Sequence, residues 1–519
     1  MFKTLILTLV CCFALIKLWG QTTTDSLVVA DNFNLQQIDL FFAETKENWS
    51  SLSVKKQQES LAQAKLYLER GFLSKAVIAQ KYGWLQAYQK WRDQAIFGSE
   101  QLAQLSDTLY RYPLADLQSN LPEKTACLEY FWGDSMVYLF YVDQETAQLL
   151  RLGRRSPQWE RQIVDFVQQL SDPERLSLGE PDLLGPFIQE SSALYARFLA
   201  PVVSLLPMRK KLLIIPDGPL YQLPFEVLLH QPAGRKRFGD LPYLFREKAI
   251  FYHYSSNLFL QEQDSLPQKG GQLLAIAGTY QQDQGRKLAV LPKKRLEIGR
   301  LARQFEGRFL LDSLATEANF KANVNRYAVI HLALHSLQEP RQPLESALAF
   351  SNITHKQEDD LLQAEEIMNL PISADLTVLS ACQGAKRGQT SSALSRAFMY
   401  AGCPTTLISL WQIDDESTAV LLEDYYRQIA AGAEKSTALQ RAKLKYLSEN
   451  RNSLASHPIF WSAFIQFGPD QPIYLAERAV GNAVLFLASI FAGGIGLLLI
   501  LSVILRWKRD NATAGVYRK

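Results

Sequence analysis

The fold is decided by two short apolar runs, AVIHLALHS at residues 328–336 and DLTVLSACQGA at residues 375–385. Both are rich in Val, Ile and Leu, which is typical of strands buried in a parallel sheet, and a helix-length segment separates them. The first run carries His335 near its end and the second carries Cys382. Because the reactive crevice of an open α/β sheet lies outside the carboxyl ends of its strands, we expect these two side chains to meet there.

Strand and helix signals alternate on both sides of these runs. The alternation predicts an α/β fold with a mostly parallel sheet flanked by helices. An antiparallel meander is predicted before it, within residues 126–153. The expected strands are LLIIPD, AIFYHY, QLLAIAG, RFLLD, AVIHLAL, TVLSA and TTLISLW, and the expected helices cover 159–171, 190–206, 292–305, 316–324, 363–369, 391–402, 416–430 and 435–449.

Cys382 and His335 have the residue types and the spacing of a cysteine peptidase. Such an enzyme needs a thiolate, a histidine that takes the thiol proton and returns it to the leaving amine, and donors for the oxyanion. The histidine lies 47 residues upstream of the cysteine, and Ala381-Cys382-Gln383-Gly384 reproduces a local signature of caspases, with Ser380 where that signature has Gln. The alternative for Cys382 is a small buried residue at the end of a core strand, but the spacing and the string favour a nucleophile.

Four further strings occur in the order usual for one family. They are LLIIPDGPLYQLPFEVLL (212–229), FYHYSSNLFL (251–260), AGCPTTLISLWQIDDESTAVLLEDYY (401–426) and HPIFWSAFIQFG (457–468). Together with the histidine and cysteine strings, they resemble the CHAT-domain proteins, a mainly bacterial branch of the caspase- and separase-like cysteine peptidases. The resemblance implies a caspase-like fold. Because a meander opens the family's domain, it also implies a CHAT domain over residues 122–468.

The resemblance assigns roles around the predicted dyad. It implies an oxyanion hole made by the backbone N–H groups of Cys382 and of the residue after the histidine, which is usually glycine and here is Ser336. Serine keeps the N–H but tolerates positive φ poorly, so this departure bears on the level of activity. Asp414 and Asp415 fall where separase-like relatives carry an acidic residue in the substrate pocket, which would favour Arg or Lys. The same two residues also fit the amino-terminal cap of a helix.

The other histidines and cysteines are predicted to be structural. His331 shares a strand face with His335 by the period of two, but the family pattern places the catalytic histidine second, so His331 is expected in the core. Cys403 is expected to be structural, and an odd number of cysteines outside the leader without C-x-x-C spacing indicates neither a disulfide framework nor a zinc site. No cofactor is predicted. The histidines with no cysteine nearby are expected at the surface or in packing: His230, His253, His355 and His457.

Composition bounds the possible classes of function. The chain has 519 residues, of which 47% are hydrophobic and 11% aromatic, which excludes a disordered polymer and fits two folded units plus appendages. Its 55 basic and 52 acidic residues give a net charge of only +3, so no long-range field attracts nucleic acid.

Residues 21–121 are predicted to form a helical module before the CHAT domain. Within it, Ala64, Tyr67, Gly71 and Ala76 are placed much as in one tetratricopeptide-like (TPR-like) repeat. Only one repeat is legible, whereas stable arrays need about three, so an irregular helical domain and a degenerate repeat array are both open. The module is predicted to bind a protein partner or the substrate.

Both ends of the chain carry membrane-targeting signals. Residues 1–20 have a lysine near the start, an apolar stretch and a small residue before Gln21, which predicts a secretory signal peptide, with an uncleaved anchor as the alternative. After a linker at 469–479, residues 480–505 carry no charge and are long enough to form a transmembrane helix. The basic tail at 506–519 predicts a cytoplasmic carboxyl end, a single-pass topology and a body on the periplasmic or outer side.

These expectations combine into one predicted function, a membrane-tethered caspase-like cysteine endopeptidase that cleaves a protein or peptide substrate. The alternative from another class is a catalytically inactive CHAT-fold scaffold or receptor that mediates protein–protein contacts at the membrane.

Overall fold

The computed structural model of the protein describes residues 35–49, 52–97, 113–234, 237–262, 271–280, 288, 294–339, 341–351, 360–380 and 392–478. The predicted signal peptide, transmembrane segment and basic tail lie outside these residues, and so does Cys382. Among the residues that are described, no helix is both long enough and apolar enough to cross a bilayer.

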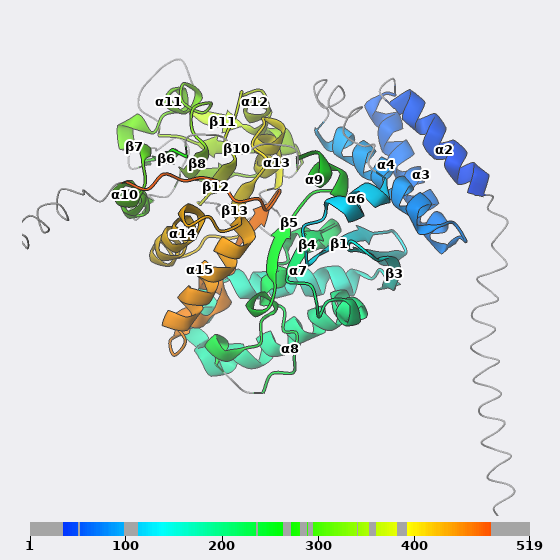
Figure 1. Cartoon of the computed structure of the whole chain (residues 1–519), viewed down its shortest axis with the longest axis horizontal. Coiled ribbons are helices and arrows are strands. Elements are labelled where there is room, and N and C mark those ends of the chain that lie inside the picture. Colours follow the sequence, from blue (N-terminus) through cyan, green and yellow to red (C-terminus); the bar gives the residue numbers. More distant parts are fainter. Residues whose placement is uncertain are drawn as a thin grey trace, which may run out of the picture.

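A single large sheet runs through the described part of the chain (Figure 1). Its strands are β1 (Thr125–Trp132), β2 (Met136–Val142), β3 (Ala147–Arg154), β4 (Lys211–Ile215), β5 (Ala249–Tyr252), β6 (Leu273–Ala277), β7 (Gly307–Leu311), β8 (Val329–Ala333), β12 (Leu376–Leu379), β13 (Thr406–Ser409) and β14 (Phe464–Phe467). They form an 11-stranded sheet in the order β3-β2-β1-β4-β5-β14-β13-β12-β8-β6-β7.

Parallel pairing predominates in this sheet, as the alternation of strands and helices predicts. From the edge strand β7 to β13, the neighbours β7–β6, β6–β8, β8–β12 and β12–β13 are all parallel. The predicted meander is confirmed, because β1–β2 and β2–β3 are antiparallel. Since β1 also pairs in parallel with β4, the meander extends the main sheet.

A second, small sheet was not expected from the sequence. It consists of β9 (His335–Leu337), β10 (Ala347–Ala349) and β11 (Leu361–Gln363), paired in antiparallel fashion in the order β11-β10-β9. β9 begins two residues after β8 ends, so the small sheet starts at the carboxyl edge of the large one.

The helices agree closely with the predicted ones, with one correction. The segment 190–206, expected as one helix, is divided in the structure. α8 begins earlier, at Glu180, and ends at Phe198. Pro201 has no N–H with which to continue an α-helix and lies in a separate 3-10 turn. The helices are α2 (Leu35–Asn48), α3 (Val54–Leu73), α4 (Ile78–Phe97), α6 (Leu114–Asn120), α7 (Pro157–Ser171), α8 (Glu180–Phe198), α9 (Ser256–Glu262), α10 (Lys294–Gln304), α11 (Glu317–Lys321), α12 (Ala364–Met368), α13 (Ser392–Tyr400), α14 (Asp415–Ala430) and α15 (Lys435–Glu449), and the 3-10 turns used below are η2 (Pro173–Leu178), η3 (Ala200–Leu205) and η11 (Pro458–Phe460).

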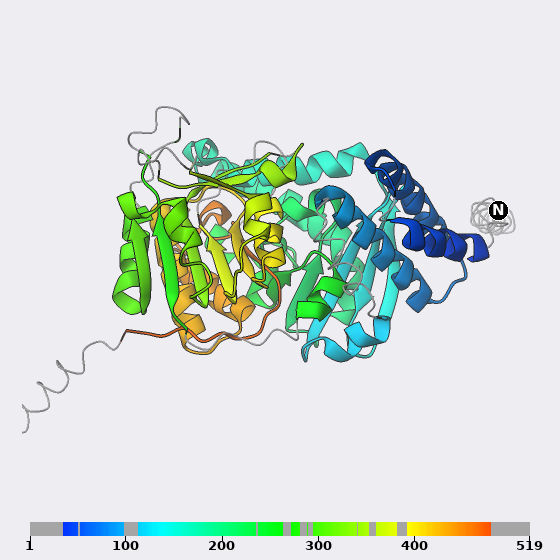
Figure 2. The ribbon, with the colours of Figure 1, turned by 90° about the horizontal axis from the view of Figure 1, so that it is seen from above.

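The amino-terminal helices α2, α3 and α4 form a layer on one face of the sheet. Side chains alternate along a strand, so Phe131 of β1 faces this layer while Tyr130 faces the core shared with α7 and α8. The ring of Phe72 in α3 lies 5.4 Å from that of Phe131 and 5.3 Å from that of Phe140. Figures 1 and 2 show these helices, in blue, at one end of the molecule, far from β6 and β7 at the other.

Candidate active site

The predicted histidine lies at the carboxyl edge of the large sheet, immediately after β8. Its imidazole is almost fully buried, with 1% exposed. The His335 backbone N–H donates to the hydroxyl of Tyr280 (3.3 Å), and that hydroxyl donates to the carbonyl of Ala349 in β10 (2.6 Å). The Tyr280 and His335 rings are 4.6 Å apart between centroids. Tyr280 therefore fixes His335 both through the backbone and by ring packing.

The carboxyl end of β12 lies beside that of β8. The two strands are parallel, with Leu379 opposite Leu332, and the Ser380 N–H donates to the Leu332 carbonyl at 3.0 Å. Tyr280 reaches the same edge from β6, whose Ala277 is paired with Ala333 of β8. The predicted convergence of the two strand ends is thus observed. Cys382, two residues beyond Ser380 in the sequence, lies outside the described residues.

Ser336, which replaces the family's usual glycine, adopts an ordinary strand backbone. It lies in β9 opposite Leu348 of β10. Among the described residues other than glycine, positive φ occurs at Lys124, Asp312 and Asp360, and Ser336 is not one of them. The concern that serine would have to adopt positive φ at this position is therefore removed.

Asp414 and Asp415 have different surroundings. Asp414 is the N-cap of α14, and its carboxylate accepts the backbone N–H groups of Glu416 (3.1 Å) and Ser417 (3.0 Å). The capping alternative is therefore the arrangement seen for Asp414. The Asp415 carboxylate lies 3.6 Å from the ammonium group of Lys294.

Lys294, which sequence reasoning missed, joins α10 to the end of β12. Its ammonium group is buried and donates to the carbonyl of Ser380 (3.0 Å) and to Glu297 (2.9 Å). Residues 294, 297, 298 and 301 follow the spacing of one helix face, and Ile298 and Leu301 of this face are in the core. The sequence does carry a signal for this pair, since Lys294 and Glu297 both lie on the apolar face of the helix. Long charged side chains are rarely buried without a partner.

Glu297 connects this lysine to His331. Burial would raise the pKa of Glu297, but the nearby positive charge of Lys294 and the contact with His331 lower it to about 2. The Nε2 atom of His331 lies 2.8 Å from the Glu297 carboxylate. The Nδ1 atom of His331 is 2.9 Å from the Tyr426 hydroxyl of α14. His331 is thus a core residue, as expected.

The two histidines have separate neighbours. β8 ends at Ala333, so the period of two that was expected to place His331 and His335 on one face does not extend to His335. His331 contacts α10 and α14, whereas His335 contacts Tyr280 and pairs with β10.

The two cysteines that the structure describes are unsuited to nucleophilic chemistry. Cys403 is fully buried and donates to the Thr405 carbonyl at 3.3 Å, and burial raises the pKa of its thiol to about 12. Burial, followed by the charge of Glu129, also raises the pKa of Cys127 well above its usual value. Because the thiolate is the reactive form, both are expected to be inert near neutral pH.

The remaining histidines mostly pack or pair with acidic residues. His253 is buried with Nε2 2.9 Å from Glu262, and His230 lies 3.5 Å from Glu247. His457 is buried at the start of η11, and His355 lies outside the described residues. Within the described ranges, no three His, Cys, Asp or Glu residues are grouped so as to hold a metal ion.

Comparison with known proteins places the chain in a family. The profile described as "CHAT domain" matches residues 189–469, which is more than half of the chain. The chain belongs to the CHAT-domain family. The matched region contains His335, Cys382, Asp414 and Asp415, whereas the meander strands β1–β3 precede it in the sequence.

The other similar proteins either match a smaller part of this chain or have low sequence identity to it. Tetratricopeptide repeat protein 28 of Mus musculus is 29% identical over 126 residues, which cover 24% of this chain and 5% of that protein, and the Homo sapiens protein of the same name gives the same figures. A crystal structure of the Saccharomyces cerevisiae separase–securin complex is 10% identical, with a TM-score of 0.46, and the match covers 84% of this chain and 37% of that chain. The chain thus spans 5% of the length of tetratricopeptide repeat protein 28 and 37% of the separase chain.

Proposed function

We propose that this CHAT-domain protein is a caspase-like cysteine endopeptidase with Cys382 as nucleophile and His335 as general acid and base. The observation that supports this most is that the carboxyl ends of β8 and β12 lie side by side. The Ser380 N–H donates a hydrogen bond to the Leu332 carbonyl at 3.0 Å. His335 follows Leu332 by three residues and Cys382 follows Ser380 by two. The chain therefore leaves the sheet toward His335 and toward Cys382 from adjacent strand ends, and ligands bind at such ends in open α/β folds.

The proposed reaction is acyl transfer through a thioester. His335 takes the proton from the Cys382 thiol, and the thiolate attacks the carbonyl carbon of the scissile peptide bond. The backbone N–H groups of Cys382 and Ser336 stabilise the oxyanion of the tetrahedral intermediate. His335 then gives its proton to the leaving amine, and water hydrolyses the thioester to release the acid and restore the thiol.

The proposed substrate preference is for Arg or Lys before the cut bond. Asp415 is the better candidate for the pocket, because the Asp414 carboxylate already accepts two backbone N–H groups as the cap of α14. A carboxylate would select a basic side chain through a charge-assisted hydrogen bond. In this proposal Asp415→Asn lowers the preference for basic over neutral peptides, and Glu416→Gln, next to it in the chain, does not.

We also propose that the domain acts at a membrane, exported by residues 1–20 and anchored by residues 480–505, with the helical layer available to a protein partner. The support is the apolar composition of both segments and the basic residues that follow the second. Protease added to intact spheroplasts should digest the body and spare a carboxyl-terminal tag. Protection of the whole chain would rule this topology out.

The test of the peptidase proposal is labelling by a thiol-reactive peptidyl probe with Arg at its terminal position. The wild-type chain should be labelled at residue 382 much faster than a free thiol in a small peptide, and Cys382→Ala and His335→Ala should abolish this labelling. Cys403→Ser is the matched control, because that thiol is buried in the core, and it should be labelled like the wild type. A rate equal to that of an ordinary thiol, unchanged in His335→Ala, would support the scaffold alternative.

A further inference from the structure

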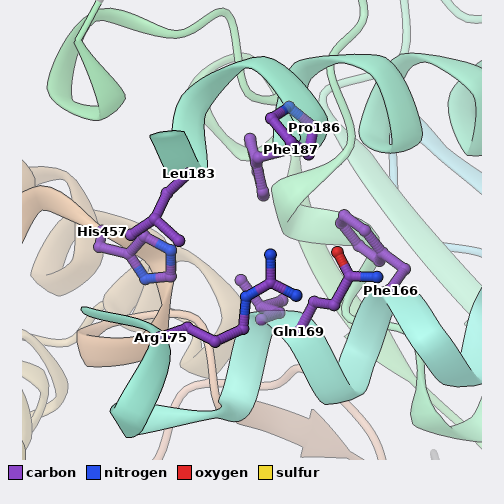
Figure 3. A pocket seen from close by; sticks show the side chains of 8 residues that line it. Phe166, Gln169, Arg175, Leu183, Pro186, Phe187 and His457 are labelled. Carbon is purple, nitrogen blue, oxygen red and sulfur yellow. The ribbon is translucent and has the colours of Figure 1, made fainter. Parts of the chain in front are cut away.

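The pocket between α7, η2, α8 and η11 is too small to take a ligand (Figure 3). Two of the aromatic rings in its lining, Phe166 and Phe187, are only 3% and 8% exposed. A ligand could not reach these rings without displacing the core. The surface at the end of the described chain is the better candidate for an interaction.

The last described segment of the chain is fixed to the amino edge of β6 and β7, the side of the sheet at which these two strands begin. The Ala476 N–H donates to the carbonyl of Gly271, two residues before β6 (2.8 Å), and the Ala476 carbonyl accepts the N–H of Glu306, which precedes β7 (2.9 Å). The Arg478 N–H donates to the carbonyl of Gln304, the last residue of α10, at 2.7 Å. Figure 1 shows this segment reaching α10.

This attachment brings the amino edge close to the predicted membrane span. Residues 480–505 carry no charge and begin two residues after Arg478. Two residues reach at most about 7 Å, which is about the thickness of one headgroup layer. With residues 480–505 in the bilayer, as proposed above, the amino edge of β6 and β7 must therefore lie at the membrane surface.

The side chains at the amino edge suit the boundary between lipid and water. Tyr474 is 62% exposed, and its ring lies against Gly271. Arg303, in the last turn of α10, and Arg478 are exposed as well. Tyrosine is enriched at membrane surfaces, and an arginine can bury its aliphatic stem while its charged group stays in water.

Exposed carboxylates balance part of the positive charge at this edge. Glu306 and Glu477 are both exposed there, one on each side of the backbone hydrogen bonds of Ala476. Contact with lipid is therefore expected with neutral headgroups, without a requirement for anionic lipid.

We propose that the amino edge of β6 and β7 rests on the phospholipid headgroups and that the candidate active site faces away from the membrane. β6 and β7 have five residues each, which is a length of about 16 Å. β8 runs parallel to β6, and His335 follows it at the opposite, carboxyl edge. This orientation rests on the proposed membrane anchor.

The orientation selects a class of substrate for the proposed peptidase. The candidate active site is about one strand length above the headgroups. The substrate that fits is a soluble protein, or a part of a membrane protein that stands clear of the bilayer. A peptide bond at the lipid surface would lie at the wrong edge of the sheet.

The experiment places benzoylphenylalanine, a photoactivatable residue, at single positions of the full-length protein in phosphatidylcholine nanodiscs. At positions 474 and 303, irradiation should cross-link the chain to lipid. Leu296 and Leu314 are the matched controls, because they are 65% and 55% exposed but lie at the carboxyl edge, in the first turn of α10 and in the 3-10 turn after β7. The same residue at positions 296 and 314 should give several-fold less lipid adduct.

The outcomes separate this orientation from the membrane anchor itself. Equal adducts at the two edges would overturn the orientation, and so would the absence of adducts at all four positions in a chain that resists carbonate extraction from membranes. Release of the chain by carbonate would overturn the anchor and the orientation together.

A second measurement checks the substrate class. Two membrane-anchored reporters carry the same Arg-containing cleavage site, one directly at the lipid and the other beyond a long flexible linker. The distant site should be cut several-fold faster. Equal cutting of the two sites would overturn the substrate class, whereas failure to cut either reporter would sink the peptidase proposal and its substrate class but leave the orientation to the cross-links.

Discussion

At the scale of single residues, a buried ionic cluster lies directly beneath the proposed active site. Lys294 donates to the Ser380 carbonyl and to Glu297, and Glu297 contacts His331. Removing charges from water is costly, and the cost is met only when every member of the cluster keeps its partners. The cluster therefore stabilises the end of β12 as long as Glu297 remains ionised.

This cluster predicts an acid-sensitive contribution to stability. The pKa of Glu297 is about 2 in the folded protein against an ordinary value of 4.5. An acid with a lowered pKa stabilises the folded state fully above its unfolded pKa, and this stability is lost as the pH falls through the folded pKa. Wild-type stability in urea should therefore decline between about pH 4.5 and pH 2.

The variant that checks this prediction is Glu297→Gln. It should lower the free energy of unfolding at pH 7 by up to about 3–5 kcal/mol, because it leaves the buried ammonium group of Lys294 with only the more distant carboxylate of Asp415, 3.6 Å away. Glu297→Gln should also reduce the loss of unfolding free energy that the wild type shows as the pH falls. Glu123→Gln is the control, since Glu123 is 78% exposed beside Lys124 and should change little. An equal effect of the two substitutions at pH 7 would contradict the prediction.

The sequence predicted the reactive pair proposed for the candidate site but not the residues that support it. His335 and Cys382 stand out because a local string and a fixed spacing mark them. Tyr280 and Lys294 come from other elements, and only the parallel pairing of β6, β8 and β12 brings them to the same edge. For Asp414 the sequence could not distinguish between two roles, because a helix cap and a substrate-binding carboxylate have the same sequence pattern.

At the scale of elements, the packing of α3 on α4 depends on a glycine. A Cβ atom added at Gly71 would lie 2.5 Å from a ring carbon of Trp84, so only glycine allows the indole to pack this closely on α3. The Trp84 indole N–H also donates to Asp39 of α2 at 2.9 Å. Trp84 therefore links all three helices, α2, α3 and α4.

Two glycine-to-alanine substitutions should have opposite effects on stability. Gly71→Ala should destabilise the protein by about 1–3 kcal/mol, because overpacking displaces the Trp84 ring. Gly83→Ala, in α4, should stabilise it by up to about 1 kcal/mol, because the added Cβ would meet no atom within 4 Å apart from its own helix backbone and chain neighbours, and alanine favours a helix. Urea unfolding curves measure both. If Gly71→Ala were also stabilising, the close contact would not exist in solution.

Element types were predictable wherever a segment is long and periodic. The strands of the large sheet and the helices α7, α10, α14 and α15 follow from their patterns. The small sheet did not, because β9, β10 and β11 have three residues each and are defined only by their pairing. Such short strands carry too little periodicity to be recognised.

At the scale of the whole molecule, the amino-terminal helices pack on the large sheet through buried polar contacts as well as apolar ones. The polar residues Gln86, Gln89 and Asp93 of α4 have the pattern of a solvated face, yet all three are buried. Gln89 donates to buried Glu129 of β1 at 2.9 Å, and Arg396 of α13 donates to Asp93 at 2.8 Å. The sequence could not reveal this, because the partners lie 40 and 303 residues away.

This arrangement predicts that the region from Pro122 onward does not fold properly without residues 35–97. Removing the helices would expose Phe131, Tyr138 and Phe140 and leave Glu129 and Arg396 without their partners from α4. Large exposed apolar patches promote aggregation. With both chains ending at Arg478, a chain that starts at Pro122 should therefore bind a hydrophobic dye and elute as aggregates in size-exclusion chromatography, whereas a chain that starts at Leu35 should elute as a discrete species. A discrete species with cooperative unfolding from the Pro122 chain would instead mean that the helices are a separable module, as the sequence alone suggests.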